Sequence, residues 1–324
     1  MGCKRLMVGT KLMENNTFTN TKYMLLGIVM LFIVSPSLWG AIEVIPNIKE
    51  SPLWGKNLIG DIFTYGTSDS LKLGYYFTLL QSVYFKPLFL GVLVGVPVVF
   101  FVHYLVIGAK EFSHDGKKVY VFTLFNRIIH AIAAISFTLL LPTGLIMIFG
   151  SVFGGGGFVF ACKEIHAIST LLFVIAVFPM FVMWVKRMFF TIDDWRWLKI
   201  LGGYLSKEKK PIPAGKFNAG QKAWFWIVTL GGVMMIWTGG IMYFQEFDLK
   251  ILTSISQIDL LRLSSIVHSA LGIVILGLFI THLYMTLFVI KGTVQNMIDG
   301  YKSEEEIENL HSSYHKELKE SGDL

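Results

Sequence analysis

The chain has 324 residues, 54% of which are hydrophobic, and its mean hydropathy is +0.61. These values exceed the usual range of soluble globular proteins and predict a polytopic α-helical membrane protein. The formal net charge of +6 does not indicate nucleic-acid binding, because the Lys and Arg residues lie between apolar segments instead of forming a basic domain.

The cysteine content restricts the cofactors that the chain can hold. There are two cysteines, Cys3 and Cys162, and they form neither a C-x-x-C nor a C-x-x-C-H motif. This excludes covalently attached c-type haem and a cysteine-ligated iron–sulfur cluster. Any redox cofactor must therefore be held by histidine.

The first 41 residues combine a basic start with one short apolar run. Residues 1–22 are polar and basic, and about sixteen apolar residues follow, up to Trp39. A run of this length is typical of a signal-peptide core, although W-G-A at 39–41 is a poor cleavage site. We therefore expect a signal peptide or an uncleaved anchor, and either choice leaves the following residues outside the cytoplasm.

Residues 42–85 mix Gly, Pro, Ser, charged and aromatic residues without a clear period, which predicts an exported periplasmic segment. The first secure membrane span is predicted at residues 87–108, within an extra transmembrane helix of residues 86–109. His103 lies near the inner end of this span and is interpreted as a structural or interfacial histidine. A polar, basic connection follows.

The next two predicted spans each carry a histidine at one end. The span at residues 128–150 begins near His130, and the span at residues 165–185 begins near His166. Between them, the four glycines at 154–157 lack the Gly-Lys-Ser/Thr of a phosphate loop and predict a flexible outer turn. His130 therefore lies near the inner membrane surface and His166 near the outer one.

The segment 186–222 is the longest internal hydrophilic connection. It holds nine Lys or Arg residues against three acidic ones, so the positive-inside rule places it in the cytoplasm. It ends in K-F-N-A-G-Q-K at 216–222, before a span predicted at residues 223–244. Asn218 can start this helix as N-cap with Gln221 at N3, or amide side chains at this depth can hydrogen-bond a carbonyl ligand.

The last predicted span lies between residues 262 and 291, where 28 residues carry no Asp, Glu, Lys or Arg. His268 and His282 are fourteen positions apart, which on an α-helix is about 40° short of four full turns and about 21 Å of rise. The two imidazoles therefore share nearly one face, at opposite depths. Gly272 and Gly277 leave room for a flat cofactor or for helix–helix packing.

The four histidines then pair by depth, His166 with His268 on the outer side and His130 with His282 on the inner side. A buried imidazole needs a partner, and a single one would as readily form a helix–helix hydrogen bond. Paired histidines on facing helices are how a helix bundle holds six-coordinate b-type haem. We therefore expect two stacked haems within residues 110–300, forming an electron path across the membrane.

The C-terminal residues 301–324 are highly charged and predict an amphipathic or disordered cytoplasmic tail. His311 and His315 in this tail are spaced i, i+4, but two ligands without a third do not make a metal site, and we leave them out. The expected fold is all-α: a four-helix transmembrane diheme cytochrome b bundle, one extra N-terminal span and the signal peptide or anchor.

Residues from about 125 to 300 resemble the cytochrome b (gamma) subunit of membrane-bound respiratory formate dehydrogenases. The resemblance rests on N-R-I-I-H at 126–130, K-E-I-H at 163–166, K-F-N-A-G-Q-K at 216–222, S-I-V-H-S-A-L-G at 265–272, and T-H-L-Y-M with V-I-K-G-T-V-Q-N-M-I-D-G at 281–300. The N-A-G-Q-K block and the last helix are the specific parts. The histidine contexts at 126–130 and 163–166 are looser.

The resemblance implies a diheme anchor for two exported subunits, a molybdenum or tungsten pterin subunit that oxidises formate and an iron–sulfur subunit. Electrons would enter at the outer haem and leave from the inner haem to menaquinone. Asn218 and Gly220, with the ligand His282, would surround the quinone headgroup. The chain would then be the electron-transfer and quinone-reducing subunit, not the formate-oxidising one.

This implies a multi-pass protein of the bacterial inner membrane, in contact with lipid and not with nucleic acid. The mature N-terminus would be periplasmic and the C-terminus cytoplasmic. Two alternatives remain. One is the cytochrome b anchor of a nickel–iron hydrogenase or a related exported oxidoreductase, which the N-A-G-Q-K block disfavours. The other is a non-redox transporter or anchor, whose histidines serve packing or proton relay.

Overall fold

The computed structural model describes residues 73–113, 116–244 and 257–324. Among these residues, five helical segments are long and apolar enough to cross a membrane: Leu73–Val106, Leu124–Ile148, Gly156–Arg187, Ala219–Tyr243 and Gln257–Val289. The prediction of an all-α, multi-pass membrane protein is therefore confirmed. The expected signal peptide or anchor lies outside the described residues.

The first span begins earlier than the sequence predicts. It comprises α3 (Leu73–Leu79), a π-helical turn (Leu80–Tyr84) and α4 (Phe85–Val106). The sequence predicts an exported segment up to residue 85, because residues 42–85 have a mixed composition without a clear period. A Lys stem can lie along a helix while its ammonium reaches water, and the π-helical turn lies just before Pro87, which cannot donate to the helical ladder.

The glycine run also contributes to a helix. α5 covers Leu124–Ile148, and α6 covers Gly156–Trp184 and ends in a 3-10 turn, Val185–Arg187. The predicted outer turn is thus shorter than its glycines suggested, since α6 already begins at Gly156. Gly154, Gly155 and Gly156 have φ angles of 76°, 62° and 62°, which L side chains rarely adopt, so glycine is required to reverse the chain here.

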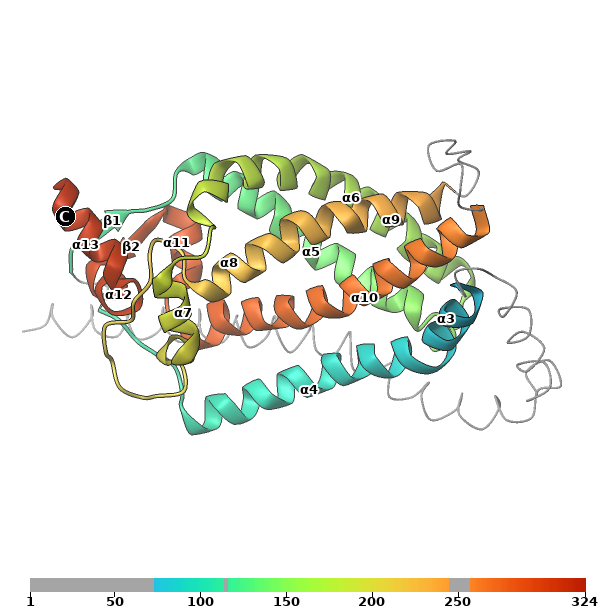
Figure 1. Cartoon of the computed structure of the whole chain (residues 1–324), viewed down its shortest axis with the longest axis horizontal. Helices are drawn as coiled ribbons and strands as arrows, with labels where there is room; N and C mark the ends of the chain where they lie inside the picture. The colour runs from blue at the N-terminus through green and yellow to red at the C-terminus, as the bar shows by residue number, and fades with distance from the viewer. Residues whose placement is uncertain (1–72, 114–115, 245–256) are drawn as a thin grey trace, which may run out of the picture. The chain divides into compact units, whose positions relative to one another are not determined.

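The last two spans each contain a π-helical turn. The fourth comprises α8 (Ala219–Trp226), the turn Ile227–Gly231 and α9 (Gly232–Tyr243). The fifth comprises α10 (Gln257–Tyr284) and the turn Met285–Val289. α10 packs against both α9 and α4 (Figure 1).

Two glycines of α10 face α4. A Cβ added to Gly272 would lie 3.2 Å from Cζ of Phe89, and one added to Gly277 would lie 3.4 Å from Cγ1 of Val92. Of the two roles that the sequence left open for these glycines, the structure supports helix–helix packing. Small residues let membrane helices approach closely in this way.

The described chain divides into two compact units. The smaller contains residues 142–166, which are the end of α5, the glycine turn and the start of α6. The larger contains the described residues of 60–141 and 167–324. An apolar core joins the helices of the larger unit, and its buried members are Phe137, Phe173, Val177, Val228 and Ile275.

Short elements gather at one end of the helices of the larger unit, which we call the loop end (Figure 1). They are β1 (Lys118–Tyr120), α7 (Ile192–Lys199), a 3-10 turn (Leu201–Gly203), α11 (Thr293–Asp299), β2 (Tyr301–Ser303), α12 (Glu304–Leu310) and α13 (Ser312–Ser321). β1 and β2 pair antiparallel, with Val119 opposite Lys302.

The C-terminal residues are folded at the loop end. Ile307, Leu310 and Leu318 are buried with residues from β1, α8 and the loop before α8. Of the two interpretations open for this tail, the amphipathic one describes α12 and α13, because each helix buries one face. The tail therefore helps to fix the loop that leads into α8.

Candidate functional site

His130 on α5 and His282 on α10 lie side by side. Their ring centroids are 6.3 Å apart and the ring planes are inclined at 55°. With a metal–imidazole bond of about 2 Å, two imidazoles on opposite sides of one iron have centroids about 6 Å apart. The spacing therefore fits a pair of axial ligands. Trp224 of α8 stacks on the ring of His282 at 5.6 Å and 19°.

His268 of α10 is held by a hydroxyl group of α9. Oγ1 of Thr238 lies 3.0 Å from Nδ1 of His268, and the same hydroxyl donates to the carbonyl of Met234 at 2.8 Å. Because the hydroxyl proton is directed at that carbonyl, Oγ1 accepts the Nδ1–H of the imidazole. This tautomer carries its lone pair on Nε2, the atom that can coordinate a metal.

His166 of α6, in the smaller unit, has a matching partner in α5. Oγ1 of Thr143 lies 3.0 Å from its Nδ1, the same distance as in the Thr238–His268 pair. His166 and His268 belong to different compact units, so their pairing stays a prediction. Neither threonine is among the residues that the sequence singles out. The signal is a Thr-Gly dipeptide, at 143–144 and 238–239, in the helix before each histidine.

The N-A-G-Q-K block forms the capping box that the sequence allows. Oδ1 of Asn218 accepts from the backbone N–H of Gln221, and Oε1 of Gln221 accepts from the backbone N–H of Asn218, both at 3.0 Å. Asn218 is buried. With its oxygen directed at the helix start, its amide NH₂ is the group suited to donate to a carbonyl ligand.

Gly220 allows a tryptophan to pack against the start of α8. A Cβ at this position would lie 3.2 Å from the indole ring of Trp197 on α7. Gly202 also lies against this ring, since a Cβ there would lie 2.5 Å from Cζ2 of Trp197, and its φ of 62° also favours glycine. Gly220 thus has a packing role, and the quinone contact that the resemblance implies for it stays a prediction.

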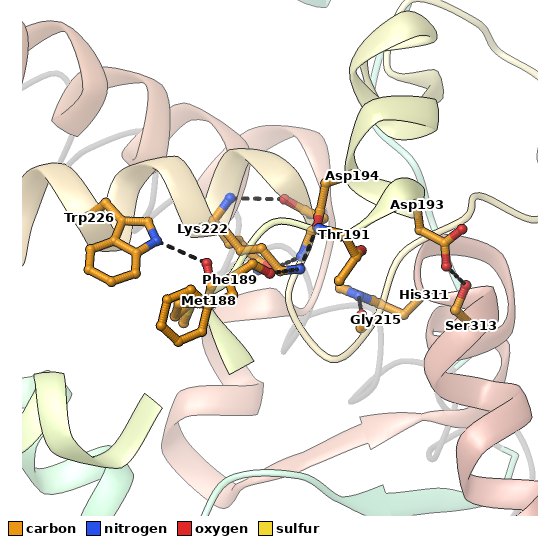
Figure 2. Close-up of polar contacts among 12 residues, drawn as sticks. Met188, Phe189, Thr191, Asp193, Asp194, Gly215, Lys222, Trp226, His311 and Ser313 are labelled. Carbon is orange, nitrogen blue, oxygen red and sulfur yellow. Dashed lines mark hydrogen bonds and ion pairs between the residues drawn. The ribbon is translucent and has the colours of Figure 1, made fainter. Parts of the chain in front are cut away.

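Lys222 and Asp194 form a buried ion pair beside this block (Figure 2). Nζ of Lys222 donates to Oδ2 of Asp194 at 2.6 Å and to the carbonyl of Phe189 at 3.1 Å, and the two side chains are 5% and 1% exposed. Oδ2 also accepts from the backbone N–H and the hydroxyl of Thr191. The sequence interpretation counted Lys222 only as a cytoplasmic charge and missed this link between α7 and α8.

The C-terminal helices hold the loop that precedes Asn218. His311 donates from Nδ1 to the carbonyl of Gly215 at 2.8 Å, and the hydroxyl of Ser313 donates to Oδ2 of Asp193 at 2.6 Å (Figure 2). Burial, and secondarily the charge of Lys302, lower the pKa of His311 to about 3, so this imidazole is neutral at pH 7. His315 contacts Glu304 at 3.3 Å.

Two lysines of the loop end are directed at backbone carbonyls. Lys110 donates to the carbonyl of Gly203, and Lys216 to that of Val121, both at 2.8 Å. Burial lowers the pKa of each ammonium group, and for Lys216 the nearby positive charge of Arg187 lowers it further. The loop end thus holds positive charge in partly buried positions.

His103 joins α4 to the loop end. Its Nε2 lies 2.9 Å from the carbonyl of Tyr204 and its Nδ1 lies 2.6 Å from the hydroxyl of Tyr284 on α10. A carbonyl can only accept, so Nε2–H donates to it and Nδ1 accepts the Tyr284 O–H. These contacts give His103 the structural role that the sequence suggested.

Comparison with known proteins places most of these residues in one family. The sequence model of the family described as prokaryotic cytochrome b561 matches residues 121–300, more than half of the chain. The matched region contains the four histidines and the N-A-G-Q-K block, and it excludes α4 and the C-terminal helices.

Several curated proteins are also similar to the chain. The nitrate-inducible formate dehydrogenase cytochrome b556(Fdn) subunit of Escherichia coli (strain K12) is 27% identical over 163 residues, 49% of this chain and 71% of that protein. The formate dehydrogenase cytochrome b556 subunit of Haemophilus influenzae is 26% identical over 156 residues, which cover 48% of this chain and 63% of that protein. The cytochrome b556(fdo) subunit of Escherichia coli formate dehydrogenase is 23% identical over 203 residues, which cover 62% of this chain and 93% of that protein.

Proposed function

Since the chain belongs to the prokaryotic cytochrome b561 family, we propose that it is the b-type cytochrome membrane subunit of a formate dehydrogenase. Its similarity to formate dehydrogenase cytochrome b556 subunits carries this assignment, because three of them align with about half or more of the chain. Membership of the family implies b-type haem. The number of haems, the quinone and the partner subunits are further parts of the proposal.

We infer two haems, each held by two histidines. His130 and His282 form one pair, supported by the 6.3 Å separation of their rings. His166 and His268 form the other, supported by their matching depth in the sequence and by their matching threonine partners. Haem supplies a one-electron carrier, while these residues coordinate it and fix its orientation.

We infer that menaquinone is reduced near the loop end. The amide NH₂ of Asn218 would donate to a quinone carbonyl, with Gly220 and the ligand His282 close to the headgroup. The capping box supports this role, because it fixes the Asn218 side chain in one orientation. The buried Lys222–Asp194 pair holds the same helix start in place.

The direction of electron flow follows from the proposed partners. An exported molybdenum or tungsten pterin subunit would oxidise formate to CO₂, releasing two electrons and a proton, and an iron–sulfur subunit would pass the electrons to the haem of His166 and His268. Electrons would leave this chain near His130 and His282, the residues that would hold the inner haem, and menaquinone would take up two electrons and two protons to become menaquinol. The excess of Lys and Arg in segment 186–222 supports a cytoplasmic loop end.

This direction has an energetic consequence. Moving one electron inward against a negative-inside potential costs about 2.3 kcal/mol per 100 mV. The free-energy difference between formate and menaquinone would have to supply that cost. Because the protons would be taken up at the cytoplasmic side, each turnover would build membrane potential.

The proposal is tested by spectroscopy of the complex purified from membranes through a tag on this chain. Dithionite-reduced minus oxidised spectra should show two b-type haems per chain, and formate should reduce both before a menaquinone analogue reoxidises them. The absence of haem bands would instead favour a transporter or passive anchor. Co-purification of a nickel–iron hydrogenase in place of a pterin subunit would overturn the formate assignment and leave the cytochrome assignment intact.

A further inference from the structure

His166 and His268 share a local arrangement of two neighbouring residues. A threonine hydroxyl lies 3.0 Å from Nδ1 of each ring, that of Thr143 for His166 and that of Thr238 for His268. The residue after each threonine is a glycine, and a Cβ added there would lie 3.3 Å from Cε1 and 3.7 Å from Nδ1 of the same histidine. The two sites therefore match at the hydroxyl and at the glycine.

The hydrogen-bond direction is fixed at one of these sites. The hydroxyl of Thr238 donates to the Met234 carbonyl one turn earlier in α9, so its oxygen accepts the Nδ1–H of His268. A ligand histidine whose second nitrogen donates to an oxygen is held in one tautomer and one orientation, and its coordinating nitrogen becomes more basic.

We propose that Thr143 and Thr238 are positioning residues that accept the Nδ1–H of His166 and His268, so that Nε2 of each ring is presented to the iron of one haem. A more basic Nε2 favours the oxidised iron, so both threonines lower the midpoint potential of that haem. This inference rests on the proposed function, in which His166 and His268 ligate the same haem.

The glycines are the second part of the arrangement. The ring of His268 lies against the backbone at Gly239, where a methyl group would be tighter than ordinary van der Waals contact and would force the ring to move by a few tenths of an ångström. The next residue, Gly240, has nothing within 4 Å of an added Cβ. The two adjacent glycines therefore provide a test position and a matched control in the same turn of α9.

The test measures the midpoint potential of each haem in the purified complex by spectroelectrochemical titration. Thr238→Val keeps the size of the side chain but cannot accept the hydrogen bond, and Thr238→Ser restores the hydroxyl. Thr286→Val is the control, because Thr286 Oγ1 donates to the backbone carbonyl of His282 and not to its ring. Thr143→Val tests the second site.

We expect Thr238→Val and Thr143→Val to raise the potential of the same one of the two haems, with a larger rise in the double variant. Thr238→Ser and Thr286→Val should match the wild type. The inference is overturned if both haems keep their wild-type potentials in Thr238→Val, or if the Ser variant shifts as far as the Val variant. If Thr238→Val and Thr143→Val change the midpoint potentials of two different haems, the claim that His166 and His268 ligate the same haem is refuted.

A second readout covers the case in which Thr238→Val does not incorporate haem. The low-spin ferric EPR signal of one haem should change in Gly239→Ala, because the ligand ring is displaced, and stay unchanged in Gly240→Ala. Identical spectra in both variants would refute the close approach of the ligand ring to Gly239. A wild-type protein without haem would refute the proposed function itself, which separates that failure from the failure of this inference.

Discussion

Two histidines of the same helix are held in different ways. His268 contacts the hydroxyl group of Thr238 in the neighbouring helix α9. His282, fourteen residues further along α10, contacts the rings of His130 and Trp224. Beyond it the chain enters the loop end, where the buried Lys222–Asp194 pair joins α7 to α8.

The surroundings of His268 and of His282 therefore depend on different kinds of contact. At His268, the hydroxyl of Thr238 contacts the imidazole within the membrane helices. Near His282, the helix start that carries Asn218 depends on packing by α7 and the C-terminal helices. We therefore expect substitutions at the first end to change the cofactor, and substitutions at the second to change the stability of the loop end as well.

The largest effect is expected from removing the ligands themselves. His268→Ala and His282→Ala should each lower the haem content from two to one per chain, and both should block formate-dependent quinone reduction. The pyridine haemochrome assay of the purified complex measures the ratio. Two haems retained in either variant would contradict the assignment of that ligand, and loss of both would show that the two ends do not fold independently.

The next largest effect is expected from breaking the buried ion pair at the loop end. Lys222→Met leaves the carboxylate of Asp194 buried without its cation, which should destabilise the loop end by about 3–5 kcal/mol. The double change with Asp194→Asn should recover part of this loss. Lys209→Met is the matched control, because the Lys209–Glu305 pair is solvent-exposed and worth less than about 1 kcal/mol. Thermal unfolding that affects both lysine variants equally would refute the role of burial.

His311 makes the loop end sensitive to acid. Its pKa is lowered to about 3 in the folded protein, against about 6.5 when unfolded, so below pH 6.5 the unfolded state binds more protons. The contribution of neutral His311 to the free energy of unfolding is therefore fully present above pH 6.5. It is lost as the pH falls towards 3, and the loss is about 2 kcal/mol at pH 5. Hydrogen exchange in residues 304–321, corrected for intrinsic rates, measures the loss.

His311→Asn provides the control for that titration. An Asn amide can still donate to the Gly215 carbonyl but has no proton to gain between pH 7 and pH 5. Its hydrogen exchange should therefore change less with pH than that of the wild type. Equal pH dependence in the two proteins would show that other groups cause the acid sensitivity.

The smallest effect is expected at Asn218. Asn218→Asp keeps an acceptor oxygen for the helix start but loses the NH₂ donor, so quinone reduction should slow by about tenfold, the value of one hydrogen bond of about 1.4 kcal/mol. Both haems should remain. Asn218→Ala should lose helix stability in addition. Wild-type quinone kinetics in the Asp variant would indicate that Asn218 acts only as the N-cap.

The sequence predicts the membrane helices well, because a long apolar run without charge has few alternatives to a spanning helix. Boundaries are harder to predict. Helix continues through Lys86, since its stem can lie along the helix, and α6 begins at Gly156, since glycine both reverses the chain and starts a helix. The capping box at Asn218 and Gln221 is one of the two interpretations that the sequence allows. It can be predicted because its two partners are only three positions apart in the chain.

The contacts that the sequence did not reveal join distant residues. Thr238 and His268 are thirty positions apart, and Lys222 and Asp194 twenty-eight, so no periodicity brings them together. The assignment of Gly272 and Gly277 to packing likewise needed the position of α4. Depth in the membrane can be counted along one helix, whereas the partner of a side chain depends on how the helices are arranged.

The small sheet has a consequence for how the two ends of the cytochrome region are held. β1 and β2, at 118–120 and 301–303, directly flank the family-matched residues 121–300 and pair with each other. The two ends of the cytochrome region are thus joined by the hydrogen bonds of this sheet. The pairing thus holds the chain just before α5 and the chain just after α11 at one place in the loop end.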